Sequence, residues 1–224
     1  MDSPLRLAIL DCDGTLVNSQ RAIIDAMGKA FAEHGLEPSE AEAVRRIVGL
    51  ELGEAVSRLM PEAGGHTHAR VTQSYRKAAH AQRAKGLRDE PLYPGAREAI
   101  EAFASAGWLL GIATGKSDRG LAEVLTRHGI HDHFVTRQTS DTAPGKPSPE
   151  MLFQALSETG VEVGSAVMIG DTTFDMEMAN NAGMAAIGVA WGYHARDDLA
   201  AAGAHCIVER FDQLPATADA LVAG

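Results

Sequence analysis

The sequence predicts an α/β fold, in which an open, doubly wound parallel sheet forms the core and a helical domain is inserted into it. Short apolar runs recur with almost no polar interruption, as expected of parallel strands covered on both faces. Segments with helical spacing separate these runs, which is the alternation of βαβ units. One interval, after the first run, contains only helical patterns and is far longer than an ordinary connection.

The expected strands are short and rich in aliphatic residues. They are "LRLAIL" at 5–10, "WLLGIA" at 108–113, "SAVMIG" at 165–170, "AAIGVA" at 185–190 and "HCIVE" at 205–209. Helices are expected between them over 94–107, 117–129, 148–160 and 173–183. Each of these helical segments ends in glycine, which is a common signal for the end of a helix.

The long interval after the first strand predicts a helical domain over residues 19–90. Apolar residues at helical spacing open it, and further helices are expected over 36–49, 53–60 and 66–84. The chain returns to the sheet through "DEPLYPG" at 89–95. We therefore expect a core made of residues 1–18 and 91–224, with the helical domain inserted as a cap between these two parts.

Composition excludes several classes of partner. The formal net charge is -10, and the 20 Lys and Arg residues are scattered along the chain. Nucleic acids and anionic membranes need clustered positive charge, so neither is an expected partner. Cys12 and Cys206 are far apart and lack the spacing of a zinc site, which favours reduced thiols in a cytoplasmic protein. The N-terminal apolar run is too short for a membrane span or a signal peptide.

Two carboxylates stand at the end of the first strand, in "DCDGT". Asp11 and Asp13 are two residues apart, so in extended backbone both side chains point to one side. Gly14 allows a tight turn after them, and the hydroxyl of Thr15 can fix that turn. In open α/β sheets ligands bind at the carboxyl ends of the strands, which makes this pair a candidate site.

Polar residues also follow the next strand and precede a later helix. Thr114 and Gly115 lie between a strand and a helix, where a hydroxyl and free backbone N–H groups can bind an oxyanion. Lys146 stands between a glycine and a proline, and these neighbours restrain its backbone. The sequence therefore predicts an anion site with a positioned ammonium group.

A second pair of acids follows the strand at 165–170. Asp171 ends this strand, and Asp175 is four residues further on, so a helix starting near Thr172 places both carboxylates on one side. Several carboxylates without a group of histidines or thiols suit a hard cation such as Mg²⁺.

Four segments, "DCDGT", "ATGKS", "GKPSPE" and "GDTTFD", resemble in order the four motifs of the haloacid dehalogenase superfamily of phosphotransferases. The helical insertion after the first motif resembles the cap of the subgroup that contains phosphoglycolate phosphatase. This resemblance implies a Rossmann-like core and Mg²⁺-dependent hydrolysis of a small phosphorylated metabolite by a monomer or homodimer. The motif set identifies the superfamily and its reaction much better than the substrate.

The resemblance also implies a role for each motif residue. Asp11 would be the nucleophile, and Asp13 the general acid and then the general base. Thr114, Gly115 and Lys146 would bind the phosphate. The metal would be held by Asp11, by the backbone carbonyl of Asp13 and by Asp171, with Asp175 orienting the ligands. Lys116 would assist phosphate binding.

Contacts from the cap are less well defined by the sequence. Arg45, Arg46 and Glu51 belong to a loop region between cap helices that could reach the substrate, but the sequence favours a solvated helix face for them.

Alternatives within the superfamily differ at single positions. Phosphosugar mutases of this subgroup usually carry a cap histidine twelve positions after the nucleophile, where this chain has Ile23. Dehalogenases and phosphonate-cleaving relatives typically lack the second acid, so Asp13 argues against both. A pyrophosphatase or a nucleotide phosphatase stays open. A receiver-type signalling domain also uses a phosphorylated Asp, but it has no inserted cap.

Overall fold

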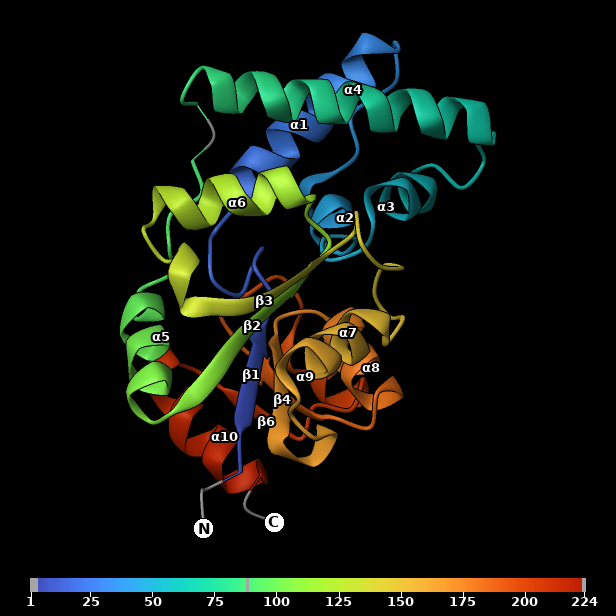
Figure 1. Cartoon of the computed structure of the whole chain (residues 1–224). Coiled ribbons are helices and arrows are strands. Elements are labelled where there is room, and N and C mark those ends of the chain that lie inside the picture. Colours follow the sequence, from blue (N-terminus) through green and yellow to red (C-terminus); the bar gives the residue numbers. More distant parts are fainter. Residues whose placement is uncertain (1–3, 88, 223–224) are drawn as a thin grey trace.

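A computed structural model describes residues 4–87 and 89–222, and within them the strands form one six-stranded parallel sheet (Figure 1). The strands are β1 (Arg6–Leu10), β2 (Trp108–Thr114), β3 (Phe134–Thr139), β4 (Ala166–Gly170), β5 (Ala185–Val189) and β6 (Cys206–Val208). Their order in space is β3-β2-β1-β4-β5-β6. The chain therefore winds outward from β1 in one direction and then from β4 in the other. The predicted doubly wound parallel sheet is confirmed.

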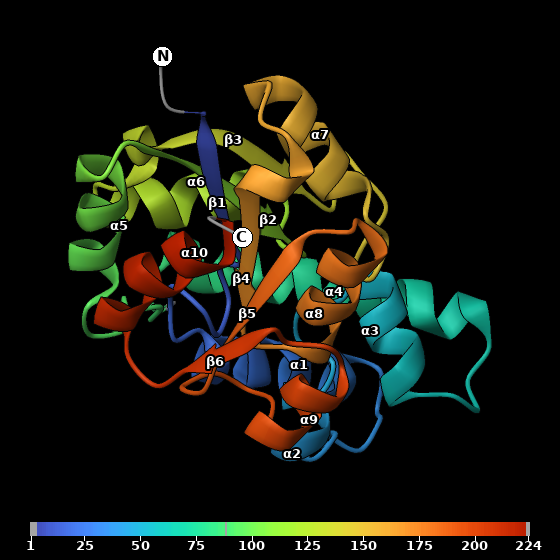
Figure 2. The same cartoon turned by 90° about the horizontal axis from the view of Figure 1, so that it is seen from below.

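Helices cover both faces of the sheet, which explains why its central strands are continuously apolar. The helices α5 (Ala96–Ser105), α6 (Asp118–Arg127) and α10 (Leu214–Val222) contribute side chains to the apolar cluster on one face. The helices α7 (Glu150–Thr159), α8 (Thr173–Asn181) and α9 (Arg196–Ala201) contribute to the cluster on the other face. Figure 2 shows α5 and α10 on the opposite side of the strands from α7 and α8.

The strand β3 was not among the predicted strands, and neither α9 nor α10 was predicted. In β3, Phe134, Thr136 and Gln138 are buried while Val135 and Arg137 are exposed. Such alternation is expected of a strand at the edge of the sheet with one face exposed to solvent. A search for continuous apolar runs does not find a strand of this kind.

Helices α1 (Gln20–Glu33), α2 (Ala41–Arg45), α3 (Leu52–Leu59) and α4 (Gly65–Ala84) form the insertion between β1 and β2. The helix expected over 36–49 is shorter than predicted, because α2 gives way to turns after Arg45. The insertion has its own apolar cluster, which includes Met27, Phe31, Val56 and Val71. It lies above the carboxyl ends of the strands, at the opposite end of the molecule from the two termini (Figure 1). The domain limits at 18/19 and 90/91 stay a prediction.

The two connections between sheet and insertion pair with each other. The backbone N–H of Asn18 donates to the carbonyl of Pro91 at 2.8 Å, and that of Tyr93 donates to the carbonyl of Leu16 at 2.9 Å. This short antiparallel pairing holds the two ends of the insertion together, just beyond the carboxyl end of the central strand β1.

No helix of the described residues has the length and hydropathy that crossing a membrane requires.

Candidate active site

The carboxyl ends of β1, β2 and β4 bring together the residues predicted to act on a phosphate. Since β1 lies between β2 and β4, its end marks the point where the winding of the sheet reverses, and ligands bind at such points. The side chains of Asp11, Thr114, Lys146, Asp171 and Asp175 are all nearly inaccessible, with at most 3% of each residue exposed. Such burial strengthens every charge interaction among them.

Lys146 lies between two of the acids. Its ammonium group is 2.8 Å from Asp11 Oδ1 and 2.6 Å from Asp175 Oδ1. Burial alone would lower the pKa of Lys146, but the neighbouring charges of Asp11 and Asp175 raise it above its usual range. The lysine is therefore held as a cation at the base of the site.

Asp175 is fixed by the start of α8. The hydroxyl of Thr172 donates to Asp175 Oδ2 at 2.7 Å, and the backbone N–H of Thr172 donates to the same oxygen at 3.0 Å. In return the backbone N–H of Asp175 donates to Thr172 Oγ1 at 3.4 Å, which completes a capping box at the first turn of the helix. Because both oxygens of Asp175 have partners, its carboxylate is well placed to orient Lys146.

Asp171 is fixed by two segments far apart in the sequence. Thr15 Oγ1 donates to Asp171 Oδ1 at 2.8 Å, and the backbone N–H of Tyr193 donates to Asp171 Oδ2 at 2.9 Å. A Cβ atom at Gly192 would lie 2.1 Å from the Cβ atom of Asp171, so only glycine fits at position 192. Sequence reasoning missed the Tyr193 contact, because a backbone donor leaves no residue-type signal.

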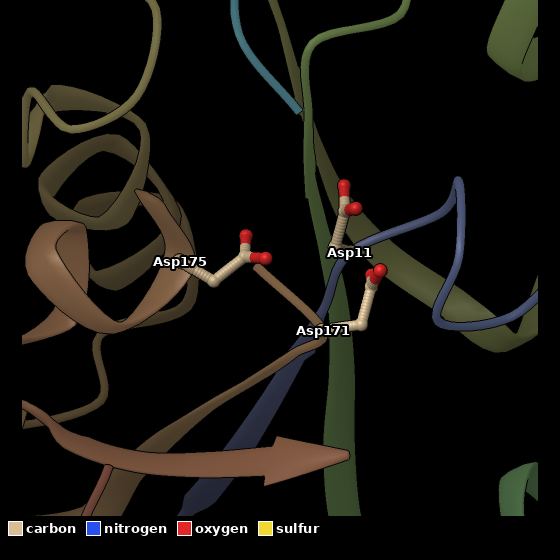
Figure 3. A group of neighbouring side chains, drawn as sticks. All are labelled: Asp11, Asp171 and Asp175. Carbon is tan, nitrogen blue, oxygen red and sulfur yellow. The ribbon is translucent and has the colours of Figure 1, made fainter. Parts of the chain in front are cut away.

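Asp11, Asp171 and Asp175 offer oxygen atoms that lie within 4.8 Å of one another (Figure 3). With Lys146 they form what we call the charged cluster, in which three carboxylates and one ammonium leave two negative charges if all are ionised. Burial raises the pKa of Asp11 to about 7, and burial with the charge of Asp11 raises the pKa of Asp171 well above its usual range.

This cluster fits a divalent cation. The Oδ2 atom of Asp11 is buried, and no described residue donates a hydrogen bond to it. A buried carboxylate oxygen without a donor is costly unless a cation binds it. Carboxylates in excess over cations supply the oxygen ligands that Mg²⁺ prefers, and a bound cation would favour their ionised forms.

Asp13 points to a separate partner, although it is only two residues from Asp11. Its Oδ1 atom is 2.8 Å from Lys116 Nζ, and the same ammonium is 2.9 Å from Glu90 Oε1. The Asp13 carboxylate thus lies outside the three-acid group. Lys116 joins Asp13 to the buried Glu90 on the returning connection, and its role in phosphate binding stays a prediction.

Thr114 and Gly115 lie where the insertion meets the sheet. The hydroxyl of Thr114 accepts a hydrogen bond of 3.3 Å from the backbone N–H of Lys116. A Cβ atom at Gly115 would lie 2.7 Å from the carbonyl oxygen of Leu50 and 2.8 Å from that of Gly49. Only glycine therefore lets this loop of the insertion lie against the end of β2.

A cavity of about 310 Å³ opens above these residues. Asp11, Asp13, Thr114, Gly115 and Lys116 line it from the sheet side. From the insertion, α4 contributes Tyr75, Arg76, Ala79, His80 and Arg83. Sequence reasoning missed these α4 residues: their spacing shows that they share one helix face, but not that this face borders the site.

Arg45, Arg46 and Glu51, the loop residues that could reach the substrate, contact groups of the insertion itself. Arg45 and Arg46 form ion pairs with Glu42 at 2.8 and 3.4 Å. The carboxylate of Glu51 accepts from the backbone N–H groups of Gly53 and Glu54 at the start of α3. The contacts of Arg45 and Arg46 match the solvated helix face that the sequence favours, whereas the capping role of Glu51 was not predicted.

Comparisons with known proteins agree with this geometry. The sequence pattern of the family "Haloacid dehalogenase-like hydrolase" matches residues 8–189. The chain is 34% identical to "Probable phosphatase IndB" of Dickeya dadantii over 219 residues, covering 96% of this chain and 94% of that protein. It is 33% identical to a phosphoglycolate phosphatase of Rhodospirillum rubrum, covering 93% of this chain and 89% of that protein.

Solved structures show the same fold. A crystal structure described as a predicted phosphoglycolate phosphatase from Haemophilus somnus superposes with a TM-score of 0.85. The two proteins share 21% sequence identity, and the match covers 96% of this chain and 98% of the other. Since the identity is low, this likeness supports the arrangement of sheet and insertion and nothing finer.

Proposed function

Since the chain belongs to the haloacid dehalogenase-like hydrolases, we propose that this phosphatase is Mg²⁺-dependent and hydrolyses a small phosphorylated metabolite, with phosphoglycolate as the reference substrate. The observation that carries the proposal is the buried Asp11 oxygen without a hydrogen-bond donor, beside Lys146 and two further acids. We also propose a cytoplasmic protein that acts as a monomer or homodimer.

The reaction begins with Asp11. One of its carboxylate oxygens attacks the phosphorus atom in line with the ester bond, so a P–O bond forms to Asp11 as the bond to the alcohol breaks. Asp13 gives its proton to the departing alcohol oxygen. The products of this step are the free alcohol, an aspartyl-phosphate at Asp11 and an ionised Asp13.

Water completes the cycle. Asp13, now a carboxylate, accepts a proton from a water molecule that attacks the aspartyl-phosphate. Inorganic phosphate leaves, and Asp11 becomes a carboxylate again while Asp13 is protonated. The contact between Asp13 and Lys116 supports this assignment, because it holds the Asp13 side chain apart from the charged cluster.

The charge of the phosphate has to be offset in a site rich in carboxylates. Asp11, Asp171 and the backbone carbonyl of Asp13 would hold Mg²⁺, and Asp175 would orient Lys146 and the metal ligands. The bound ion would reduce the repulsion between anionic nucleophile and anionic substrate. Thr114, the backbone N–H of Gly115 and Lys146 would bind the phosphate oxygens, on which charge is spread in the transition state.

The cavity wall argues against a phosphosugar mutase. Ile23, which occupies the position of the mutase histidine, lines the cavity with 6% of its surface exposed. An aliphatic side chain cannot carry a proton to or from a sugar hydroxyl.

The test measures phosphate release from phosphoglycolate and a panel of phosphorylated metabolites, with Mg²⁺ or with EDTA. We expect release that depends on Mg²⁺ and falls by at least about 10⁴-fold in Asp11→Asn, since the nucleophile is removed. Mass spectrometry of acid-quenched enzyme should find the phosphoryl group on the peptide that contains Asp11. Asp25→Asn, an exposed change on α1, is the matched control. Full hydrolysis by Asp11→Asn would contradict the assignment.

A further inference from the structure

The cavity above the charged cluster has two chemically different sides. The side formed by the sheet is polar, with Asp11, Asp13 and Thr114 at its surface. The insertion contributes Arg76, His80 and Arg83 together with an apolar surface, which we call the apolar wall. It consists of Ile23, Met27, Leu52, Ala55, Tyr75 and Ala79.

The apolar wall is a packed surface. Ile23, Met27 and Ala55 belong to the apolar cluster of the insertion, where they are 6%, 2% and 3% exposed. Their positions are set by contacts within the insertion, so the wall is formed before a ligand arrives. Covering such a surface with an apolar ligand group is favourable by roughly 25 cal/mol per Å².

The lysine and the arginines that line the cavity all lie near carboxylates, with the exposed Arg76 the furthest from its partner, at 3.8 Å from Glu51. Lys116 pairs with Asp13 and Glu90, and Arg83 lies 2.7 Å from Glu123. A second anionic group close to the phosphate would compete with these carboxylates for the same cations and would be repelled by them. The carboxylate of phosphoglycolate is such a group, and its single methylene group covers little of the apolar wall.

The cavity is also larger than the two-carbon body of phosphoglycolate would fill. At about 310 Å³ the cavity lies within the range of roughly 300–1,000 Å³ that is typical of pockets for drug-sized ligands. We infer that the natural substrate is a phosphomonoester whose alcohol has a hydrocarbon or aromatic body, which packs on the apolar wall while the phosphate lies over Asp11. This inference rests on the proposed phosphatase function.

A series of alkyl phosphates tests the inference. Ethyl, butyl, hexyl and cyclohexylmethyl phosphate have leaving alcohols of similar acidity, so differences in kcat/KM report contacts with the leaving group. We expect kcat/KM to rise about threefold to fourfold for each methylene group that the wall covers. Cyclohexylmethyl phosphate should exceed both ethyl phosphate and phosphoglycolate by at least about tenfold.

Variants of the wall sharpen the test. Met27→Gln makes the wall more polar at nearly constant side-chain size. Ala79→Leu keeps the wall apolar but reduces the volume of the cavity. Both should lower the ratio of kcat/KM for cyclohexylmethyl phosphate to that for ethyl phosphate by about tenfold. Met60→Gln changes a partly buried methionine of the insertion that does not line the cavity, and it should keep the ratio. Circular dichroism identifies any variant that does not fold.

The outcomes separate the two proposals. If no phosphomonoester is hydrolysed, the proposed function fails. If the protein hydrolyses phosphomonoesters but prefers phosphoglycolate, and its rate does not depend on alkyl length, the inferred substrate class is wrong and the phosphatase assignment stands. A dependence on alkyl length that survives both wall variants would also overturn the role of the wall.

Discussion

The charged cluster and the apolar wall face each other across one cavity but are built differently. The cluster collects Asp11, Lys146, Asp171 and Asp175 from strand ends, a loop and the start of a helix, so its residues are distant in sequence. The wall comes from helices of one continuous insertion, between residues 20 and 84. The cluster depends on fixed charges, whereas the wall depends on shape and apolar area.

This difference separates reaction from substrate. Charges and hydrogen-bond donors that act on a phosphate have to keep fixed positions for any phosphomonoester, so a change in the cluster should affect all substrates alike. A change in the wall should affect substrates according to their alcohol, because only the leaving group reaches it. Each prediction below tests one side of this contrast.

Among the variants that keep the nucleophile Asp11, the largest effect is expected for Lys146→Met. The substitution removes the ammonium that is shared by Asp11 and Asp175 and that would bind the phosphate. Loss of one such donor typically lowers kcat by about 10²–10³-fold. Because two buried carboxylates lose their partner, the free energy of unfolding should also fall, by about 3–5 kcal/mol.

The loss in activity from Lys146→Met should be the same factor for ethyl and cyclohexylmethyl phosphate. Lys77→Met, an exposed change on α4, is the control for the loss of a lysine, and urea unfolding supplies the stability. A loss that differs strongly between the two substrates would show that Lys146 takes part in substrate selection. It would contradict the division between the charged cluster and the apolar wall.

The sequence predicted that the residues of the cluster lie together, because Asp11 and Asp171 follow strands, Lys146 follows a glycine, and Asp175 lies one helical turn after Asp171. Asp11 and Asp171 directly follow apolar runs, and parallel strands bring such positions together at one edge of the sheet. The doubly wound order of the sheet followed from the same runs. The strand β3 was not predicted, because its buried and exposed residues alternate. This pattern comes from its place at the edge of the sheet, which is known only once the sheet is assembled.

The wall was not predictable in the same way. Ile23 and Met27 have the spacing of a helix face, but that face could pack equally against another helix or line a cavity. Which of these happens depends on how α1 and α4 cross above the sheet, and no local pattern encodes that crossing. The Lys116 contact with Glu90 joins two loops and was missed for the same reason.

Stability should depend on pH through the cluster and not through the wall. The pKa of Asp11 is about 7 in the folded protein, against 3.8 for an unperturbed carboxyl. Between these values the folded state keeps a proton that the unfolded state releases. The contribution of Asp11 to the free energy of unfolding should therefore be fully present below about pH 4 and be lost as the pH rises through about 7. Asp171 contributes in the same direction.

Binding of Mg²⁺ should oppose this loss. The ion adds about 2.7 kcal/mol when its concentration is 100 times its dissociation constant. Urea unfolding across the same pH window, with EDTA or with Mg²⁺, checks both statements. Asp11→Asn should flatten the dependence seen in EDTA, while Met27→Gln should shift all values without changing their slope. Equal stability of the EDTA-treated wild type from about pH 4 to pH 7 would show that the pKa of Asp11 is not raised in the folded protein.

The smallest effect is expected at Glu90, which links the site to the base of the insertion. Its carboxylate is buried and lies 2.9 Å from Lys116, whose ammonium also contacts Asp13. Glu90→Gln keeps the size of the side chain but replaces an ionic contact with a weaker neutral one, so the position of Lys116 becomes less well defined. We expect kcat/KM to fall about tenfold for every substrate, equivalent to about 1.4 kcal/mol.

Because Glu90 acts through Lys116 and Asp13, its loss should lower kcat more than it raises KM. Glu101→Gln, an exposed change on α5, should leave both constants near the wild-type values. Lys116→Met combined with Glu90→Gln should cost no more than Lys116→Met alone, since the glutamate has lost the group through which it acts. If the losses in kcat/KM are additive, Glu90 instead serves the packing of the returning connection. Other residues would then couple the insertion to the charged cluster.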